Sequence, residues 1–243
     1  MKTTLIALVF AATAVAAQAH HVWIEQDAQG AKLYFGEFGE NMREASPGLL
    51  DKFPGPVATR VTADGDSKPA VTKTANGFAI AGRAGKGESI VAEEAGYASY
   101  PQKDGDKTIR GIYVPAARLV ADFAKQAPKL TLDIVPTGKA GDEGVEFQVV
   151  FKGKPLPKAK IEVINTLGWN QEHRSDDNGL FTVKLPWQGT YVLELQHRDN
   201  AGGERASGEK YDRASYVTSL TVLQPSGLPT LPVPPVAAPS KSN

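Results

Sequence analysis

Two adjacent histidines, His20 and His21, follow a stretch typical of a secretion signal. This stretch has a positive Lys2, an apolar run over residues 5–16 and the small-x-small cleavage site Ala17-Gln18-Ala19. If the signal is cut after Ala19, His20 becomes the first residue of the exported chain. Its free α-amino group and its imidazole are then two nitrogen donors on one residue, and His21 adds a third beside them. The terminus is therefore a candidate metal site.

The donors of such a terminus select transition metals. An α-amino group has a pKa of about 8 and imidazole one of about 6.5, so both can give up a proton to a metal at neutral pH. Imidazole suits nickel, cobalt, copper and zinc, whereas calcium and magnesium prefer oxygen. The same chelate occurs in histidine-brace copper proteins, where it needs a further histidine from a distant strand. A cut after Ala17 would instead make His20 the third residue, which binds copper(II) or nickel(II) in a square plane.

His197 is the candidate for the distant ligand. It ends an expected strand over residues 191–197, on the same face as Tyr191, Leu193 and Leu195. Two interpretations stay open for it: a histidine at the rim of the core, or a fixed metal ligand where the two halves of the chain meet. Since the chain has only four histidines, two adjacent ones at the expected mature start are not expected by chance. The prediction names His20, His21 and His197 as metal ligands.

Composition excludes several other functions. The chain has no cysteine, so disulfides, thiolate metal sites and cysteine nucleophiles are excluded. Basic and acidic residues balance at 27 each, which leaves no positive excess for nucleic acid or an anionic membrane surface. No Gly-x-Ser-x-Gly, His-Glu-x-x-His or phosphate-loop motif is present. Adjacent carboxylates such as Glu93-Glu94 point to opposite faces of a strand and do not suit glycoside hydrolysis. We expect a binding protein rather than an enzyme.

The elements that must position these residues are short strands. Over residues 20–127, alternating apolar residues predict one β-domain. Within it, Pro115 to Ala127 has helix-like spacing and predicts a short helix or an irregular loop. Its expected strands lie near residues 22–25, 32–38, 78–80, 89–92 and 111–114.

Alternation is stricter over residues 128–223. Seven short strands separated by turns such as Asp176-Asp177-Asn178-Gly179 predict an immunoglobulin-like β-sandwich. Residues 224–243 are rich in proline without a period, which is typical of a disordered tail. The whole is predicted to be all-β, with a signal peptide at 1–19, two β-domains at 20–127 and 128–223, and the tail.

Several motifs resemble one family. Ala19-His20-His21-Val22-Trp23 is similar to the mature start of periplasmic accessory proteins of nickel and cobalt uptake, a family long classed as a domain of unknown function. Gly153-Lys154-Pro155-Leu156, residues 175–181 and residues 185–191 are similar to its carboxypeptidase-regulatory or transthyretin-like β-sandwich. The resemblance covers essentially the whole mature chain, most clearly residues 145–223.

The resemblance implies an exported, soluble periplasmic protein that binds a transition metal and hands it to a membrane importer. His20 matches the family's histidine after the cleavage site, and His197 matches its histidine after the Tyr-x-Leu strand. His21 stands where other members often carry a different residue. Copper binds most nitrogen sites more tightly than nickel or cobalt, so affinity alone does not name the physiological ion.

Two other functions remain open from the sequence. One is a histidine-brace copper oxidase acting on a polymer, which needs a second nitrogen site facing His20 and an aromatic surface. The other is a metal-free β-sandwich that serves as a binding or structural module. Metal binding that is lost in a His20→Ala variant would exclude the metal-free module. Unchanged metal affinity in that variant would exclude both metal functions.

Overall fold

The computed structural model of the protein describes residues 20–230 and 232–240, so the predicted signal peptide at 1–19 lies outside it. Within these residues there is no α-helix, and the all-β prediction is confirmed. None of their helices is long and apolar enough to cross a membrane. The elements are β1 (His21–Gln26), β2 (Ala31–Glu37), β3 (Met42–Arg43), the 3-10 helix η1 (Leu49–Lys52), β4 (Val57–Val61), β5 (Val71–Thr74), β6 (Gly77–Ile80), β7 (Ser89–Glu93), β8 (Tyr100–Asp104), β9 (Lys107–Val120), β10 (Leu132–Gly141), β11 (Gly144–Phe151), β12 (Lys154–Pro155), β13 (Lys160–Asn165), β14 (Asn170–Arg174), β15 (Leu180–Val183), β16 (Gly189–Asp199), β17 (Gly203–Glu204), β18 (Lys210–Tyr211) and β19 (Arg213–Gln224).

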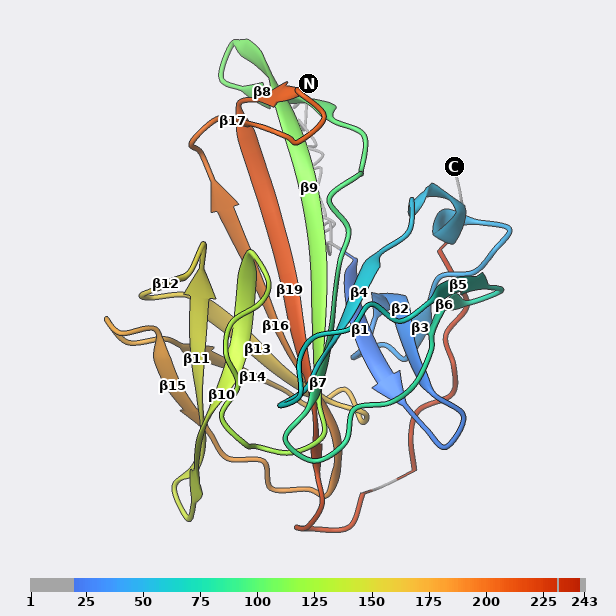
Figure 1. Cartoon of the computed structure of the whole chain (residues 1–243), viewed down its shortest axis with the longest axis vertical. Helices are drawn as coiled ribbons and strands as arrows, with labels where there is room; N and C mark the ends of the chain where they lie inside the picture. The colour runs from blue at the N-terminus through green and yellow to red at the C-terminus, as the bar shows by residue number, and fades with distance from the viewer. Residues whose placement is uncertain (1–19, 231, 241–243) are drawn as a thin grey trace, which may run out of the picture.

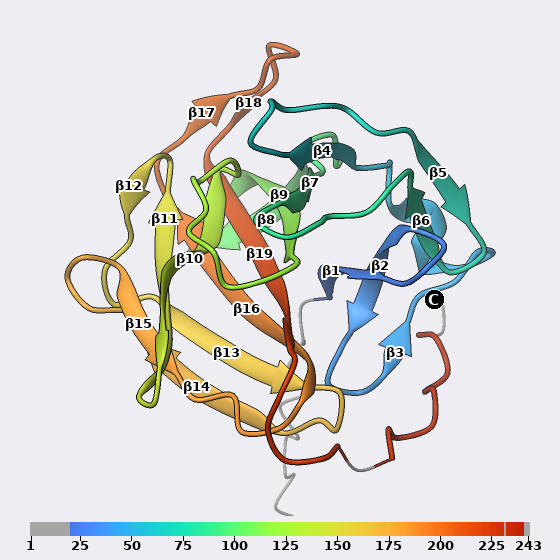
Figure 2. The ribbon, with the colours of Figure 1, turned by 60° about the horizontal axis from the view of Figure 1, so that its bottom comes forward.

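These strands form three layers, with one long sheet in the middle and a smaller sheet on each side (Figure 1). The central sheet has the order β14-β13-β16-β19-β9-β7-β4, with β8 paired to β9. The N-terminal sheet, made of β1, β2, β3, β5 and β6, lies on one side of it. The C-terminal sheet, made of β10, β11, β12 and β15, lies on the other side (Figure 2). The hairpin β17–β18 forms a separate two-stranded sheet that contacts the end of the central sheet near β9.

Strand β16 shows how one sheet serves two cores. Its Tyr191 and Leu193 face the C-terminal sheet and are fully buried with Phe147 of β11. Its Val192 points the other way and packs on Trp23 of β1. Successive side chains of a strand point to opposite faces, so the alternation of apolar residues on both faces makes this a middle layer. Burial on both sides fixes the register of the strand.

The central sheet also joins the two halves of the sequence. Strand β9, from the half predicted as residues 20–127, runs parallel to β19, from the half predicted as 128–223. The paired residues extend from Gly111↔Arg213 to Leu119↔Thr221. A parallel pair between segments so distant in sequence holds the halves together through backbone hydrogen bonds.

The expected helix or loop after Pro115 is wrong up to residue 120. Pro115 to Val120 continue β9, where Ala117 and Leu119 face the N-terminal sheet while Val120 faces the larger core. The Pro115 carbonyl accepts a bond from Glu94 N at 2.9 Å, one residue beyond the last paired residue of β7. Pro115, which has no N–H to donate, therefore lies opposite the end of β7. A sheet tolerates proline at such a position.

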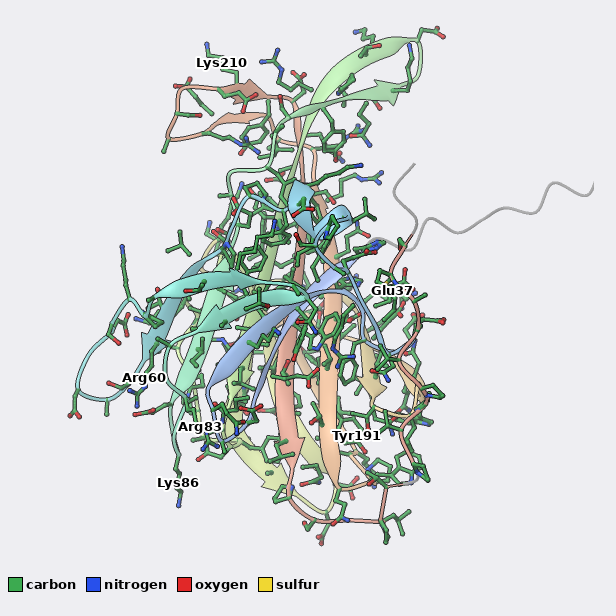
Figure 3. All side chains as sticks on the ribbon, turned by 90° about the vertical axis from the view of Figure 1, so that its right-hand side faces the viewer. Glu37, Arg60, Arg83, Lys86, Tyr191 and Lys210 are labelled. Carbon is green, nitrogen blue, oxygen red and sulfur yellow. The ribbon has the colours of Figure 1, made fainter. Side chains whose placement is uncertain are left out.

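The described part of the proline-rich tail returns to the N-terminal sheet (Figure 1). Ala237 forms a parallel bridge with Met42, and Asn41 Nδ2 donates to the Pro234 carbonyl at 2.7 Å. Figure 3 places Glu37, the last residue of β2, on the same side of the molecule as this segment. The described part of the tail thus reaches His20, with Ser240 Oγ 3.4 Å from His20 Nε2.

Candidate metal-binding terminus and acidic pocket

His20 lies directly before β1 and is held by its neighbours on the N-terminal face of the central sheet. Its ring centroid is 5.1 Å from that of Phe35 on β2. Its backbone carbonyl accepts a hydrogen bond from Tyr113 Oη of β9 at 2.7 Å. The side chain keeps 21% of its surface exposed. His20 is therefore fixed in place and still partly open to solvent.

The partner of the His20 ring is a fully buried glutamate. Nε2 of His20 lies 2.5 Å from Oε1 of Glu44, whose side chain is 0% exposed. Glu44 follows β3, and its N–H donates to the Phe35 carbonyl at 2.8 Å. An ionised carboxyl of Glu44 can only accept a hydrogen bond, so with a neutral His20 this contact favours the tautomer that carries the ring proton on Nε2. In that tautomer Nδ1, the nitrogen nearer the backbone, keeps its lone pair.

His21 contacts a second buried glutamate. Its Nδ1 lies 3.1 Å from Oε2 of Glu194 on β16, and the Glu194 side chain is 8% exposed. Burial lowers the pKa of His21 to about 4, against an opposing effect of Glu162. The pKa of Glu194 is raised to about 8, mainly by burial and in part by the nearby Glu162 and Glu37 carboxylates. At pH 7 both partners are therefore neutral.

Glu194 and His21 border an acidic pocket of about 580 Å³. Its floor is the N-terminal face of β13 and β16, where Glu162 and Glu194 are directly paired. Its wall is the turn after β2. The lining residues are His21, Glu37, Phe38, Gly39, Glu40, Lys160, Glu162, Ile164, Gly168, Asn170, Glu194, Leu195 and Gln196.

The structure does not bring His197 to the terminus. His197 shares the face of Leu195, and its ring lies 4.5 Å from that of Phe151 on β11. That contact is on the C-terminal side of the central sheet, whereas His21 and Glu194 are on the N-terminal side. Of the three predicted ligands, the structure therefore places His20 and His21 near one another and His197 on the opposite face.

A metal at this terminus would depend on a donor from the backbone. In the part of the chain that the structure describes, no three His, Asp or Glu side chains are grouped so as to hold a metal ion. A chain cut after Ala19 supplies its own second donor, the α-amino group of His20, beside the free Nδ1. These two atoms fit the nitrogen preference of nickel, cobalt and copper.

Sequence reasoning missed the glutamates that contact the two histidines. Glu44 lies in a loop-rich stretch without a period, where nothing singles it out. Glu194 carried a signal, since it stands between Leu193 and Leu195 in a strand with the apolar Val192 on its own face. A carboxylate in a strand that is apolar on both faces requires a partner, because an unpaired buried charge is costly.

One comparison with known proteins identifies the family. The model of the family described as domain of unknown function DUF4198 matches residues 17–199. The chain belongs to this family. The DUF4198 match includes the His20–His21 pair and extends to the end of β16. No curated protein and no solved structure matches the chain.

The pH dependence of stability should report the Glu194 carboxyl. Its folded pKa is raised from 4.5 to about 8, so its contribution is full below pH 4.5 and is lost as the pH rises through 8. The pKa of His21 is lowered from 6.5 to about 4, so its contribution is lost as the pH falls below 6.5. The two oppose each other below pH 6.5, and above it Glu194 acts alone. We expect a decline of roughly 2 kcal/mol in unfolding free energy between pH 6.5 and 8.

Urea unfolding in the presence of a chelator measures this decline. A Glu194→Gln variant should lose most of it, because glutamine does not titrate. Glu143→Gln, at a side chain that is 94% exposed, should keep it. If the unfolding free energy of Glu194→Gln fell as much between pH 6.5 and 8 as that of the wild type, the raised pKa would not belong to Glu194.

Proposed function

We propose that this DUF4198 protein is a periplasmic transition-metal-binding protein, an accessory of nickel or cobalt uptake that can also take copper. The ion would be held by His20 as the first residue of the exported chain. The observation that carries this proposal is the 2.5 Å contact between His20 Nε2 and the fully buried Glu44. A carboxylate on the far nitrogen of a metal-binding histidine fixes its tautomer and raises its basicity.

The remaining donors of His20 suit a chelate. Nδ1 and the α-amino group belong to one residue, so a single ion closes a ring with both. His21 is the predicted third nitrogen donor, and no described residue bonds its Nε2. Two or three protein donors at a partly exposed site leave room for exchange, as transfer to a membrane importer requires.

The surroundings favour a cation. His20 lies near the carboxyl of Glu37, whose pKa burial raises and the histidine lowers. Glu44 adds a second carboxyl group beside His20. A concentration of acidic groups in a partly desolvated site raises the local concentration of positive ions.

The motifs of the second half support the same family of accessory proteins. Residues 153–156, 175–181 and 185–191 resemble the carboxypeptidase-regulatory or transthyretin-like sandwich of that family. In the structure, the turn at Asp176 to Gly179 closes with Gly179 N bonded to the Asp176 carbonyl at 3.0 Å. The last of these segments leads into β16, the strand that carries Glu194 and its contact to His21.

The copper-oxidase alternative needs a second histidine facing His20. His173 pairs with Ile161 of β13, on the face buried against the C-terminal sheet, and its ring lies 6.3 Å from that of Phe181. His197 lies on the same C-terminal side. With both on the far face, the arrangement favours metal carriage over oxidation.

Native mass spectrometry tests the proposal with two chains. One begins at His20, and the other carries Ser-Gly-Ser-Gly ahead of His20 and so displaces the α-amino group. With nickel, cobalt and copper each offered alone and then together, we expect one ion on the first chain. The extended chain should bind at least about tenfold more weakly, as loss of one charge-assisted or metal-donor contact implies.

A His173→Ala chain beginning at His20 is the matched control and should bind like the wild type. Equal binding by the two chains would place any metal elsewhere. Absence of an ion on the chain that begins at His20 would leave a metal-free β-sandwich module.

A further inference from the structure

We infer that the acidic pocket between the central sheet and the turn after β2 binds a small organic polycation, a linear molecule with two or more amino groups. This inference does not rest on the proposed metal function. It rests on the charge of the pocket, on a buried carboxylate oxygen without a donor among the described residues, and on the placement of acidic side chains on two sides of the pocket.

The charge of the pocket is one-sided. Four of its lining residues are glutamates, and its single basic residue is Lys160. Lys160 Nζ is already held by two carboxylates, with Oε1 of Glu162 and Oε2 of Glu172 each at 3.1 Å. Glu37, Glu40 and Glu194 have no lysine or arginine partner among the described residues. The pocket therefore lacks the cations that its acidic groups require.

Glu194 marks the place where a donor is missing. Its side chain is 8% exposed, and Oε1 is buried without a hydrogen-bond partner in the described structure. Its cross-strand neighbour is Glu162, whose negative charge opposes ionisation of Glu194 and would be offset by a cationic ligand. A buried acceptor without a donor carries a desolvation penalty that one ligand N–H would remove.

The acidic groups are arranged for a molecule rather than for one ion. Glu162 and Glu194 come from the floor strands, whereas Glu37 and Glu40 come from the turn that forms the wall. Within the described chain they form no group of three that could hold a metal ion.

A linear polyamine can neutralise the glutamates of the floor and those of the wall at the same time. Its amino groups are separated by short alkyl spacers and can reach the floor and the wall together. The spacers would contact the apolar side chains of Phe38 and Ile164, which also line the pocket. The volume of about 580 Å³ is in the range of small-molecule sites.

Calorimetric titration of the full mature chain in a chelator tests the inference. Spermidine is the probe, and butylamine is its monoamine control. We expect spermidine to bind at least about tenfold more tightly than butylamine, because only the triamine can contact the glutamates of the floor and of the wall together. Glu162→Gln should weaken spermidine binding at least about tenfold, as expected for loss of a charge-assisted hydrogen bond. Glu194→Gln should weaken it as much, because a bound ammonium group can ionise the Glu194 carboxyl but not an amide.

Glu143→Gln, which removes a highly exposed carboxylate on the β10–β11 turn, should bind spermidine like the wild type. Equal binding of spermidine and butylamine, or an equal loss in Glu143→Gln, would overturn the inference in favour of general charge attraction. No binding of spermidine at millimolar concentration would overturn it as well.

A His20→Ala variant separates this pocket from the metal terminus. Spermidine binding should persist in that variant whether or not the terminus binds metal. If nickel displaced spermidine from His20→Ala, the pocket would be a metal site and the inference would be wrong. Circular dichroism of each variant confirms that its strands are intact.

Discussion

Replacing Asp133 by asparagine is expected to lower the free energy of unfolding by about 3–5 kcal/mol, because it strands a buried arginine without its counter-ion. Arg118 on β9 and Asp133 on β10 are both 0% exposed. Arg118 Nε lies 3.0 Å from Oδ1, and its Nη2 lies 2.6 Å from Oδ2. This two-pronged pair links the central sheet to the C-terminal sheet at the point where the chain passes from one half to the other.

Neighbouring groups raise the cost of breaking this pair. Arg118 also donates to Ser89 Oγ at 2.8 Å and to the Ala127 carbonyl at 3.1 Å. Asp133 Oδ2 accepts the N–H groups of Lys129 and Leu130. The aspartate thereby shapes the connection after β9 as well as neutralising the arginine. An asparagine would keep some of these bonds but would leave a buried positive charge.

Chemical denaturation of two further variants tests whether the loss of stability in Asp133→Asn comes from burial of the pair. Asp66→Asn removes the partner of Lys129 at 2.7 Å, in a pair whose side chains are 36% and 40% exposed. It should cost no more than about 1 kcal/mol. An apolar double variant, Arg118→Met with Asp133→Leu, should recover most of the stability lost in Asp133→Asn. If Asp133→Asn cost as little as Asp66→Asn, the pair would not anchor the fold.

The strands could be predicted because their signal is local. Alternation located β1, β2 and most strands after residue 130, and the predicted turn at Asp176 to Gly179 closes with Gly179 N bonded to the Asp176 carbonyl at 3.0 Å. The prediction for the segment after Pro115 was wrong because this local signal is missing there. A strand buried on both faces carries apolar residues at all positions, so its spacing does not separate strand from helix.

The layering could not be predicted because it depends on distant pairs. The parallel contact of β9 with β19 joins residues about a hundred positions apart, and nothing in either segment names its partner. That pairing decides which face of β16 meets β1. It is why Glu194, and not His197, lies beside His21. His20 and His21 could be singled out from residue type, whereas their carboxylate partners could be identified only from the fold.

Replacing Glu44 by leucine is expected to weaken metal binding at His20 by tenfold to a hundredfold, the usual range for loss of such a hydrogen-bonded partner. Leucine is apolar and of similar size, so it suits the fully buried position of Glu44. Without the acceptor at 2.5 Å, the His20 ring proton is free to occupy Nδ1, where it competes with the metal. Glu44→Gln keeps an acceptor oxygen without the charge and should show a smaller loss.

Two readouts distinguish positioning of His20 from general damage to the fold. Nitrogen NMR of the metal-free chain should show His20 protonated at Nε2 in the wild type and a mixture of both tautomers in Glu44→Leu. Metal titration of the same samples should show the loss of affinity, while Glu143→Gln stays at the wild-type value. An unchanged tautomer together with unchanged metal affinity in Glu44→Leu would refute the role of Glu44. A changed tautomer with unchanged affinity would mean that the ion does not bind through Nδ1, and the terminal chelate would have to be abandoned.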